Sequence, residues 1–316
     1  MWVLSEIKEK VCCFINLTLD KSHFITEVER MNKLLSAEFV RLFKSLVFRI
    51  CLLVSGGFGI FLVLMRWWDV RKNAAIYADL SVEYRNADNL IFMGGFYLIF
   101  AAAVLIGVFV GTEYSDGTIR NKLTAGHTRG TIYLSKFIVC AVADVMIHLL
   151  YIFVVLIFGN CLIGGTTMTI TEVISFTLVG TTAMLGLTAL LIVCSMSIQS
   201  KAIGSIVCLV VALIMMILAI MIGTRLEEPK YYDGYTYIDE NTGEAVVASK
   251  EKNPNYLTGT KRKVYAFLNN VLPVSQLYQI VVRVSDNLFV IVISDLVIMI
   301  VSTGAGMVIF GKKDLK

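Results

Sequence analysis

The chain has 316 residues, of which 57% are hydrophobic and only 16% are charged, and its mean hydropathy is +0.76. Soluble domains carry about 25% charged residues, so this composition excludes an ordinary soluble enzyme and indicates a polytopic membrane protein. The net charge of +4 is modest, and no nucleic-acid partner is expected. The seven cysteines are odd in number and lack CxxC spacing, so neither a disulfide framework nor a metal site is expected.

The chain begins with a polar, amphipathic leader of balanced charge over residues 1–30. Two interpretations stay open: the leader is a short interfacial helix, or it is an extension outside the natural chain. A regular helical period begins at Met31, and we hypothesise that translation can begin there. A chain that starts at Met31 and fails to insert or to function would contradict this hypothesis.

Residues 31–46 predict an amphipathic helix that lies in the headgroup plane of the membrane. Its basic side chains, Lys33, Arg41 and Lys44, project away from the apolar face. That face consists of Leu35, Phe39, Leu42 and Leu46, which follow one another at helical spacing.

Six apolar runs follow, each near the roughly 20 residues that cross about 30 Å of hydrocarbon. Trp67 and Trp68 close the first run as an interfacial anchor. The predicted spans are about 47–66, 90–112, 133–158, 173–197, 202–223 and 288–311. The predicted fold is therefore all-α. Its parts in chain order are the leader, the interfacial helix, spans 1 to 5 over 47–223 with a coupling helix at 113–132, a long loop over 224–287, span 6 and a tail over 312–316.

The distribution of basic residues predicts the orientation. The segments on one side of the predicted membrane hold twelve Lys and Arg and four acidic residues, whereas the loops on the other side hold twelve of each. The first group comprises 32–49, 113–136, Lys201 and 312–316, and the second comprises 66–89 and 224–287. The positive-inside rule therefore places both termini and the segment 113–136 in the cytoplasm.

The loop 224–287 is predicted to lie outside the cell and to contain a small β-hairpin. Its strands are expected at 235–239 and 244–248, because these runs flank the turn sequence Glu240-Asn241-Thr242-Gly243.

The same loop continues into two predicted short helices, 264–272 and 275–282, broken around Pro273. Their apolar residues favour helices that dip toward the membrane surface, and a solvated connector stays as the alternative.

Three ionisable residues lie inside predicted spans. Asp144 and His148 are four residues apart and share one face of the third span, and Asp295 lies near the middle of the sixth. Such groups either line a polar cavity or make hydrogen bonds between packed helices, and both interpretations stay open.

Small residues occur in pairs where helices could approach each other closely. These pairs are Ser55 and Gly59, Gly94 and Gly95, Thr182 and Gly186, and Ser302 and Gly306. We expect them to pack helices inside the subunit, and some could serve a subunit–subunit interface.

The polar segment 113–136, between the second and third predicted spans, contains a predicted short helix. Asp116-Gly117 makes a turn, and Asp116 is available to cap a helix over Thr118–Leu123. Gly126 is expected to end this helix, and Thr128 to cap the third span.

One face of this predicted helix is apolar. Ile119 and Leu123 share it at i, i+4, while Arg120 and Lys122 point elsewhere. The apolar stripe is too small to be buried alone, so it would suit a groove on a soluble partner.

Two glycine-containing stretches resemble nucleotide-binding loops but cannot hold ATP. The run Gly159–Thr166 has glycine where a P-loop needs its phosphate-binding lysine, and Leu53–Gly57 lies inside the first predicted span. No catalytic constellation is predicted in this chain. If the protein uses ATP, a partner supplies the ATPase.

The run Gly111–Leu123, followed by Arg129 and Ser135-Lys136, resembles the second cytoplasmic-loop motif of bacterial ABC transporter type-2 permeases, in particular those of Gram-positive bacteria. These are six-span exporter subunits. The similarity covers the layout of about residues 31–316, although this chain lacks the family's usual proline near Gly126.

The resemblance implies which residues couple to the ATPase. Ile119 and Leu123 would enter a groove of a separate ATPase subunit, with Glu113 and Arg120 as polar contacts. The complete set implied for coupling is Glu113, Asp116, Gly117, Thr118, Ile119, Arg120, Leu123 and Arg129.

The resemblance also implies an assembly and a location. Two permease subunits, identical or different, would sit on two ATPase subunits in the bacterial cell membrane, with ATP and Mg²⁺ bound by the ATPase and no cofactor in this chain. Substrate would move outward along the dimer interface. The sequence does not identify that substrate, and an antimicrobial peptide, a drug and a lipid all stay open.

Two other functions were weighed. The alternative is an ion-coupled secondary transporter that uses Asp144, His148 and Asp295, which would predict inverted repeats that the sequence does not show. A membrane scaffold or sensor would explain the spans but not the composition of the segment 113–136.

Overall fold

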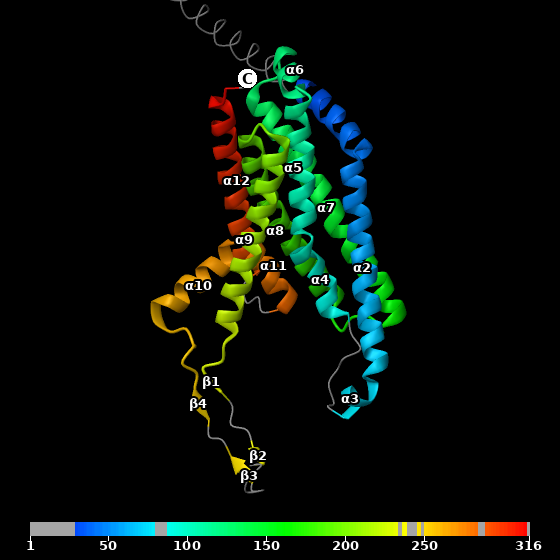
Figure 1. The fold of residues 1–316 in the computed structure, drawn as a ribbon, viewed down its shortest axis with the longest axis vertical. Coiled ribbons are helices and arrows are strands. Elements are labelled where there is room, and N and C mark those ends of the chain that lie inside the picture. Colours follow the sequence, from blue (N-terminus) through cyan, green and yellow to red (C-terminus); the bar gives the residue numbers. More distant parts are fainter. Residues whose placement is uncertain are drawn as a thin grey trace, which may run out of the picture.

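A computed structural model describes residues 29–79, 87–232, 236–238, 245–247, 250–283 and 288–314. The predictions for the leader, apart from its last two residues, lie outside this part of the chain. The chain forms a bundle of long helices, with a β-hairpin at one end and a short helix, α6, at the other (Figure 1). We call these the hairpin end and the α6 end.

Within the described residues, six helices are long and apolar enough to cross a membrane, which confirms the predicted all-α fold with six spans. Each extends beyond its predicted apolar run because the helical backbone continues into polar flanks. The second span is divided at Leu98 into two helices. The spans are α2 (Leu46–Lys72), α4 and α5 (Asp88–Tyr97 and Ile99–Ser115), α7 (Arg129–Leu162), α8 (Ile170–Ser197), α9 (Lys201–Glu227) and α12 (Leu288–Lys312).

A helix over residues 29–44, here called the N-terminal helix, precedes α2 and agrees with the predicted interfacial helix. Its buried face overlaps the predicted apolar face, since Leu42 is buried and Leu35 and Phe39 are partly buried against the core. Leu34, Glu38 and Leu42 are buried, whereas Leu46 is 69% exposed at the start of α2. The prediction missed Glu38 because a buried carboxylate is the last residue that hydrophobic periodicity would select.

The core of the bundle lies around α5, α7 and α8. The most extensive helix contacts join α8 to α12, α5 to α9 and α2 to α7. By contrast, α2, α9 and α12 leave much of their apolar surface exposed. Such surface suits contact with lipid or with another transmembrane subunit.

The predicted small-residue pairs do bring helices together inside the subunit. Gly59 of α2 lies against Tyr151, Val154 and Val155 of α7, and a methyl group on Gly94 would lie 2.2 Å from the ring of Tyr151. At the other pairs, Gly186 faces Asp295 and Pro273, and Gly306 faces the hydroxyl group of Tyr133.

The hairpin end contains the predicted β-hairpin. Strands β2 (Thr236–Ile238) and β3 (Ala245–Val247) pair antiparallel, as expected, and β1 (Tyr231–Tyr232) and β4 (Glu251–Lys252) form a separate antiparallel pair nearer the bundle (Figure 1). A further short helix, α3 (Ala74–Asp79), follows α2 at the same end (Figure 1).

The two predicted loop helices are present as α10 (Gly259–Val271) and α11 (Pro273–Val282). Pro273 is the first residue of α11, a position where its missing N–H costs nothing. Val274, Leu277 and Ile280 are buried, and α11 packs against α4, α8 and α9. The two helices are therefore present as predicted, and α11 packs into the bundle; their depth in the membrane stays a prediction.

Candidate functional site

The polar segment between the second and third spans folds as a turn, the short helix α6 (Thr118–Thr124) and a second turn. Gly117 has φ of +68°, a left-handed conformation that glycine adopts without steric cost. The prediction that Asp116 caps α6 is wrong. Asp116 ends α5, and α6 starts after Gly117 without a side-chain cap among the described residues, since the left-handed turn already directs the chain into the helix.

The other two boundary predictions for this segment are confirmed. The helix ends before Gly126, which has φ of +88°. The hydroxyl group of Thr128 accepts a hydrogen bond from the backbone N–H of Thr131 at 3.2 Å and so caps α7.

Five charged side chains meet where α6 joins the bundle, and we call them the charge cluster. Glu113, at the end of α5, accepts hydrogen bonds from Lys122 at 2.6 Å and also from Arg41 and Lys136. Glu38 of the N-terminal helix pairs with Lys122 and Lys136. The cluster thus joins the N-terminal helix, α5, α6 and α7 in one network.

Three members of the charge cluster are buried, whereas the side chains of Lys122 and Arg41 are 17% and 31% exposed. Lys136, Glu113 and Glu38 are 0%, 1% and 2% exposed. Isolated buried ions are very unfavourable, so each charge depends on the others for compensation. Arg41 and Lys136 also lie 4.6 Å and 5.1 Å from the ring centroid of Phe109, which adds a favourable cation–π contact.

The pKa of Glu38 shows how strongly the two neighbouring lysines stabilise its ionised carboxylate. Burial by itself raises the pKa of the Glu38 carboxyl, but Lys136 and Lys122 outweigh burial and lower that pKa from 4.5 to about 2. In the folded protein Glu38 is therefore ionised at all but very acidic pH.

This lowered pKa predicts a pH dependence of stability. Because the carboxyl holds its proton less tightly in the folded state, its contribution is complete above about pH 4.5 and is lost as pH falls toward 2. We expect the difference in unfolding free energy between the natural protein and Glu38→Gln to be constant from pH 7 to 5 and to shrink by pH 3. Unfolding by SDS in mixed micelles measures it. A difference that grew on acidification would contradict the assignment.

The structure places the residues implied for ATPase coupling in two groups. Ile119 is 1% exposed and packs inside the chain, Leu123 is half-buried against the core, and Glu113 belongs to the charge cluster. Ile119 and Glu113 thus attach α6 to the rest of the chain, and neither side chain lies on the surface of the described structure. Thr118 contributes to the same attachment by donating a hydrogen bond to the backbone carbonyl of Glu113 at 3.3 Å.

The second group faces away from the bundle. Asp116 and Arg120 are exposed, together with their neighbours Asn121 and Thr124 on α6. We call these four residues the docking face. Asn121 and Thr124 were missed by sequence reasoning because they are small polar residues with no distinctive pattern.

Arg129, the last of the implied residues, holds α7 to the end of α12. Its guanidinium group donates to the backbone carbonyl of Phe310 at 3.0 Å and to that of Lys313. Nearby, Lys313 donates to the carbonyl of Met196 at 3.0 Å. The α6 end is therefore tied together across α7, α8 and α12.

The three intramembrane ionisable residues are all buried and all contact α8. Asp144 accepts a hydrogen bond from Thr188, and Asp295 accepts one from Thr182 at 2.8 Å. These threonines are six residues apart, which separates them by about 9 Å along the helix axis. His148 lies between the two glycines Gly95 and Gly180 of the flanking helices. Asp144 and Asp295 thus make hydrogen bonds between packed helices, whereas neither ring nitrogen of His148 has a hydrogen-bond partner among the described residues, so both interpretations stay open.

Sequence reasoning missed the charge cluster apart from Glu113. One signal was available: Glu38 stands between Leu34 and Leu42 at i±4, on the face that proved to be buried. Lys136 lies at the start of an apolar run, where a lone cation needs a partner.

The chain was compared with known proteins. A family described as "ABC-2 family transporter protein" matches residues 34–224, from the N-terminal helix to the end region of α9, which is more than half of the chain. No curated protein matches.

Proposed function

Because the chain belongs to the ABC-2 family of transporter proteins, we propose that it is the membrane-spanning permease subunit of an ATP-driven exporter. A separate ATPase subunit binds ATP and Mg²⁺. Two permease subunits associate, and the transport path runs along the interface between these two subunits. The excess of basic residues supports an orientation with the α6 end and both termini in the cytoplasm and the hairpin end outside a bacterial cell.

One observation supports this proposal above the others: α6 is fixed to the bundle on one side and free on the other. The charge cluster and the buried side chain of Ile119 hold its inner side. Its docking face carries polar and charged groups of both signs, which suit the rim of a soluble partner's groove.

The attachment explains how movement would reach the spans. A force on α6 passes through Lys122 to Glu113 at the end of α5 and to Glu38 of the N-terminal helix. Because α5 packs along α9, and α7 packs against α2 and α8, a tilt of α6 moves several spans together. A closing ATPase pair would thus shift the bundle between two arrangements.

The test is co-purification of the ATPase with variants of the docking face. We expect Arg120→Glu combined with Asn121→Glu to abolish recovery of the ATPase from native membranes, because two new negative charges replace a cation and an amide at the contact. The amount of ATPase recovered is expected to fall at least tenfold, while membrane insertion and yield of the permease variant stay unchanged.

Lys44→Glu is the matched control, since it reverses an exposed charge at the same end of the bundle outside α6. Undiminished recovery of the ATPase with the docking-face variant would overturn the proposal. Substitution of Ile119 by a charged residue is not a suitable test, because that side chain is buried and its loss would disturb folding.

No finding supports the alternative of an ion-coupled secondary transporter, and Asp144 and Asp295 each accept a hydrogen bond from a threonine of α8. The transported substrate stays open among peptides, drugs and lipids. The molecules that co-purify with the assembly from native membranes would identify the substrate.

A further inference from the structure

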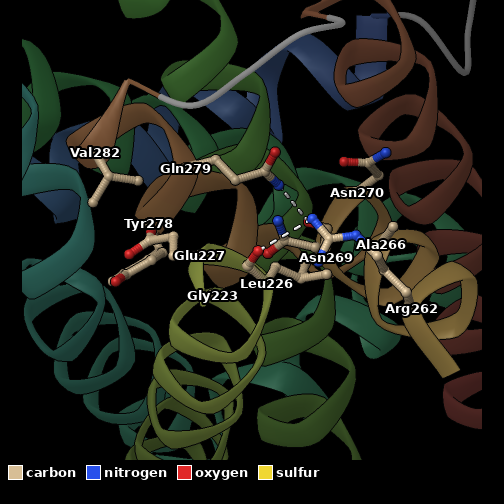
Figure 2. A pocket seen from close by; sticks show the side chains of 10 residues that line it. All are labelled: Gly223, Leu226, Glu227, Arg262, Ala266, Asn269, Asn270, Tyr278, Gln279 and Val282. Carbon is tan, nitrogen blue, oxygen red and sulfur yellow. Dashed lines mark hydrogen bonds between the residues drawn. The ribbon is translucent and has the colours of Figure 1, made fainter. Parts of the chain in front are cut away.

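A polar pocket lies at the hairpin end, between the end of α9 and the two loop helices (Figure 2). Its volume is about 330 Å³, near the lower limit of small-molecule sites. We call it the α9–α11 pocket. Its lining residues are Gly223, Leu226, Glu227, Arg262, Ala266, Asn269, Asn270, Tyr278, Gln279 and Val282.

The pocket contains one cation with an unused donor. The Nη2 atom of Arg262 donates to the backbone carbonyl of Leu226 at 3.3 Å, and the guanidinium group lies 4.9 Å from the ring centroid of Tyr256. Its Nη1 atom is buried and has no hydrogen-bond partner among the described residues. A buried N–H of a charged group without an acceptor is costly, so an acceptor inside the pocket would stabilise it.

The opposite charge is supplied by Glu227, in the last turn of α9. This carboxylate lies beside the hydroxyl group of Tyr278: burial raises the pKa of that hydroxyl, and the neighbouring Glu227 raises it further. Among the described residues no ion pair joins Glu227 to Arg262. The pocket therefore presents a cation and an anion that do not neutralise each other by direct contact.

An amide group adds an unused acceptor. The side-chain oxygen of Asn269 is buried without a hydrogen-bond donor among the described residues, while its backbone carbonyl accepts from Gln279 at 2.7 Å. A ligand that satisfies all of these groups must carry an anionic acceptor and, at a short distance from it, a cationic or neutral N–H donor.

The surroundings of the pocket indicate where such a ligand comes from. Gly223, Leu226 and Glu227 belong to the end of a membrane span, and α10 carries the exposed apolar side chains Val264 and Phe267. Beside Arg262, α10 also carries two exposed lysines, Lys261 and Lys263. A basic start followed by an apolar face is typical of a helix that lies at the membrane–water interface.

We propose that the α9–α11 pocket binds the headgroup of a zwitterionic phospholipid that bears both a phosphate and a primary ammonium group. The phosphate meets Arg262, the ammonium group meets Glu227 and the side-chain oxygen of Asn269, and the acyl chains lie along the apolar face of α10. This inference does not depend on the ATPase proposal, because it concerns the opposite end of the bundle.

The test uses the purified full-length protein in detergent and titrates it with short-chain lipids, with binding read by native mass spectrometry. The probes are dihexanoyl phosphatidylethanolamine, its trimethylated choline analogue and dihexanoyl phosphatidic acid. We expect the ethanolamine lipid to bind about tenfold more tightly than either of the others, because only it has both the phosphate and an ammonium N–H donor.

The variants separate the two charges. Arg262→Gln is expected to weaken all three lipids about tenfold, whereas Glu227→Gln is expected to remove only the preference for the ethanolamine lipid. Lys263→Gln is the matched control, which removes a neighbouring exposed charge and should change binding less than twofold. If Arg262→Gln does not fold, Arg262→Lys retains the charge without the planar fork and should bind with a several-fold loss.

Three outcomes would overturn the inference. The first is equal binding of the three lipids, and the second is unchanged binding by both Arg262 variants. The third is displacement of the lipid by free dipeptides at equal concentration, which would make the pocket a peptide site. Free phosphoethanolamine distinguishes a headgroup site from a lipid site: weak competition is expected, since it lacks the acyl chains, and competition equal to that of the lipid would contradict the role of α10.

Discussion

Glu113→Gln is expected to destabilise the folded protein by roughly 3–5 kcal/mol, the usual cost of breaking a buried ion pair by removing one partner. Glu113 is 1% exposed and compensates three cations, Arg41, Lys122 and Lys136. After the substitution Glu38 alone would face all of them, and Lys136 would stay fully buried. Unfolding by SDS in mixed micelles, followed by far-ultraviolet circular dichroism, measures the change.

Asp116→Asn is the matched control, because it removes an exposed carboxylate three residues away and should change stability by less than about 0.5 kcal/mol. A double variant, Glu113→Gln with Lys136→Met, removes one charge of each sign and should recover part of the loss. If Glu113→Gln were no more harmful than Asp116→Asn, the charge cluster would not be what holds α6 to the bundle.

Gly107→Ala and Gly111→Ala are each expected to destabilise the protein by roughly 1–3 kcal/mol, by forcing apart two spans that touch through their backbones. A methyl group on Gly107 would lie 2.6 Å from the Cα atom of Ser205, and one on Gly111 would lie 2.8 Å from that of Lys201. Backbone atoms cannot rotate away as a side chain can, so α5 and α9 must separate. The double variant should lose more than either single one.

Two other span glycines serve as controls for this prediction. A methyl group on Gly57 of α2 or Gly304 of α12 would have no heavy atom of the described structure within 4 Å. Alanine at these positions should leave stability unchanged or raise it by up to about 1 kcal/mol, because alanine favours the helix. The same SDS unfolding assay compares the four variants. Equal effects at Gly107 and Gly57 would show that α5 and α9 are not closely packed in solution.

The glycine pair on α5 shows a limit of sequence reasoning. Gly107 and Gly111 form a GxxxG spacing, which is known to let helices approach. The spacing does not say which helix approaches, and it was not among the small-residue pairs singled out. Of those pairs, Gly59, Gly94, Gly186 and Gly306 do contact other helices.

Several predictions needed only local information, and these are confirmed. The six spans follow from apolar length, the hairpin from a turn sequence between two strand-forming runs, and the start of α7 from a capping threonine. The placement of Pro273 at the start of α11 has the same local origin. Each of these depends on the preferences of a few neighbouring residues and on transfer of a segment out of water.

Other features depend on residues that are distant in the sequence. Glu38 and Lys122 are 84 positions apart, and Glu113 and Arg41 are 72 apart, so no local pattern relates them. The burial of Glu38 on the N-terminal helix was missed for this reason. The wrong cap of α6 has a local cause, because the left-handed Gly117 takes the place of the expected aspartate. The inward position of α11 likewise depends on the helices around it.

The segment between the second and third spans has features of both kinds: some depend on neighbouring residues and others on residues distant in the sequence. By itself the sequence determined that this segment is polar, that it contains a short helix and that it resembles the coupling loop of ABC transporter permeases, since composition, turn residues and motif are all local properties. Only the tertiary structure decided which side of that helix is buried. Ionic compensation among Glu38, Glu113, Lys122 and Lys136 requires four separate helices to meet, and this buries Ile119 while leaving Arg120 exposed.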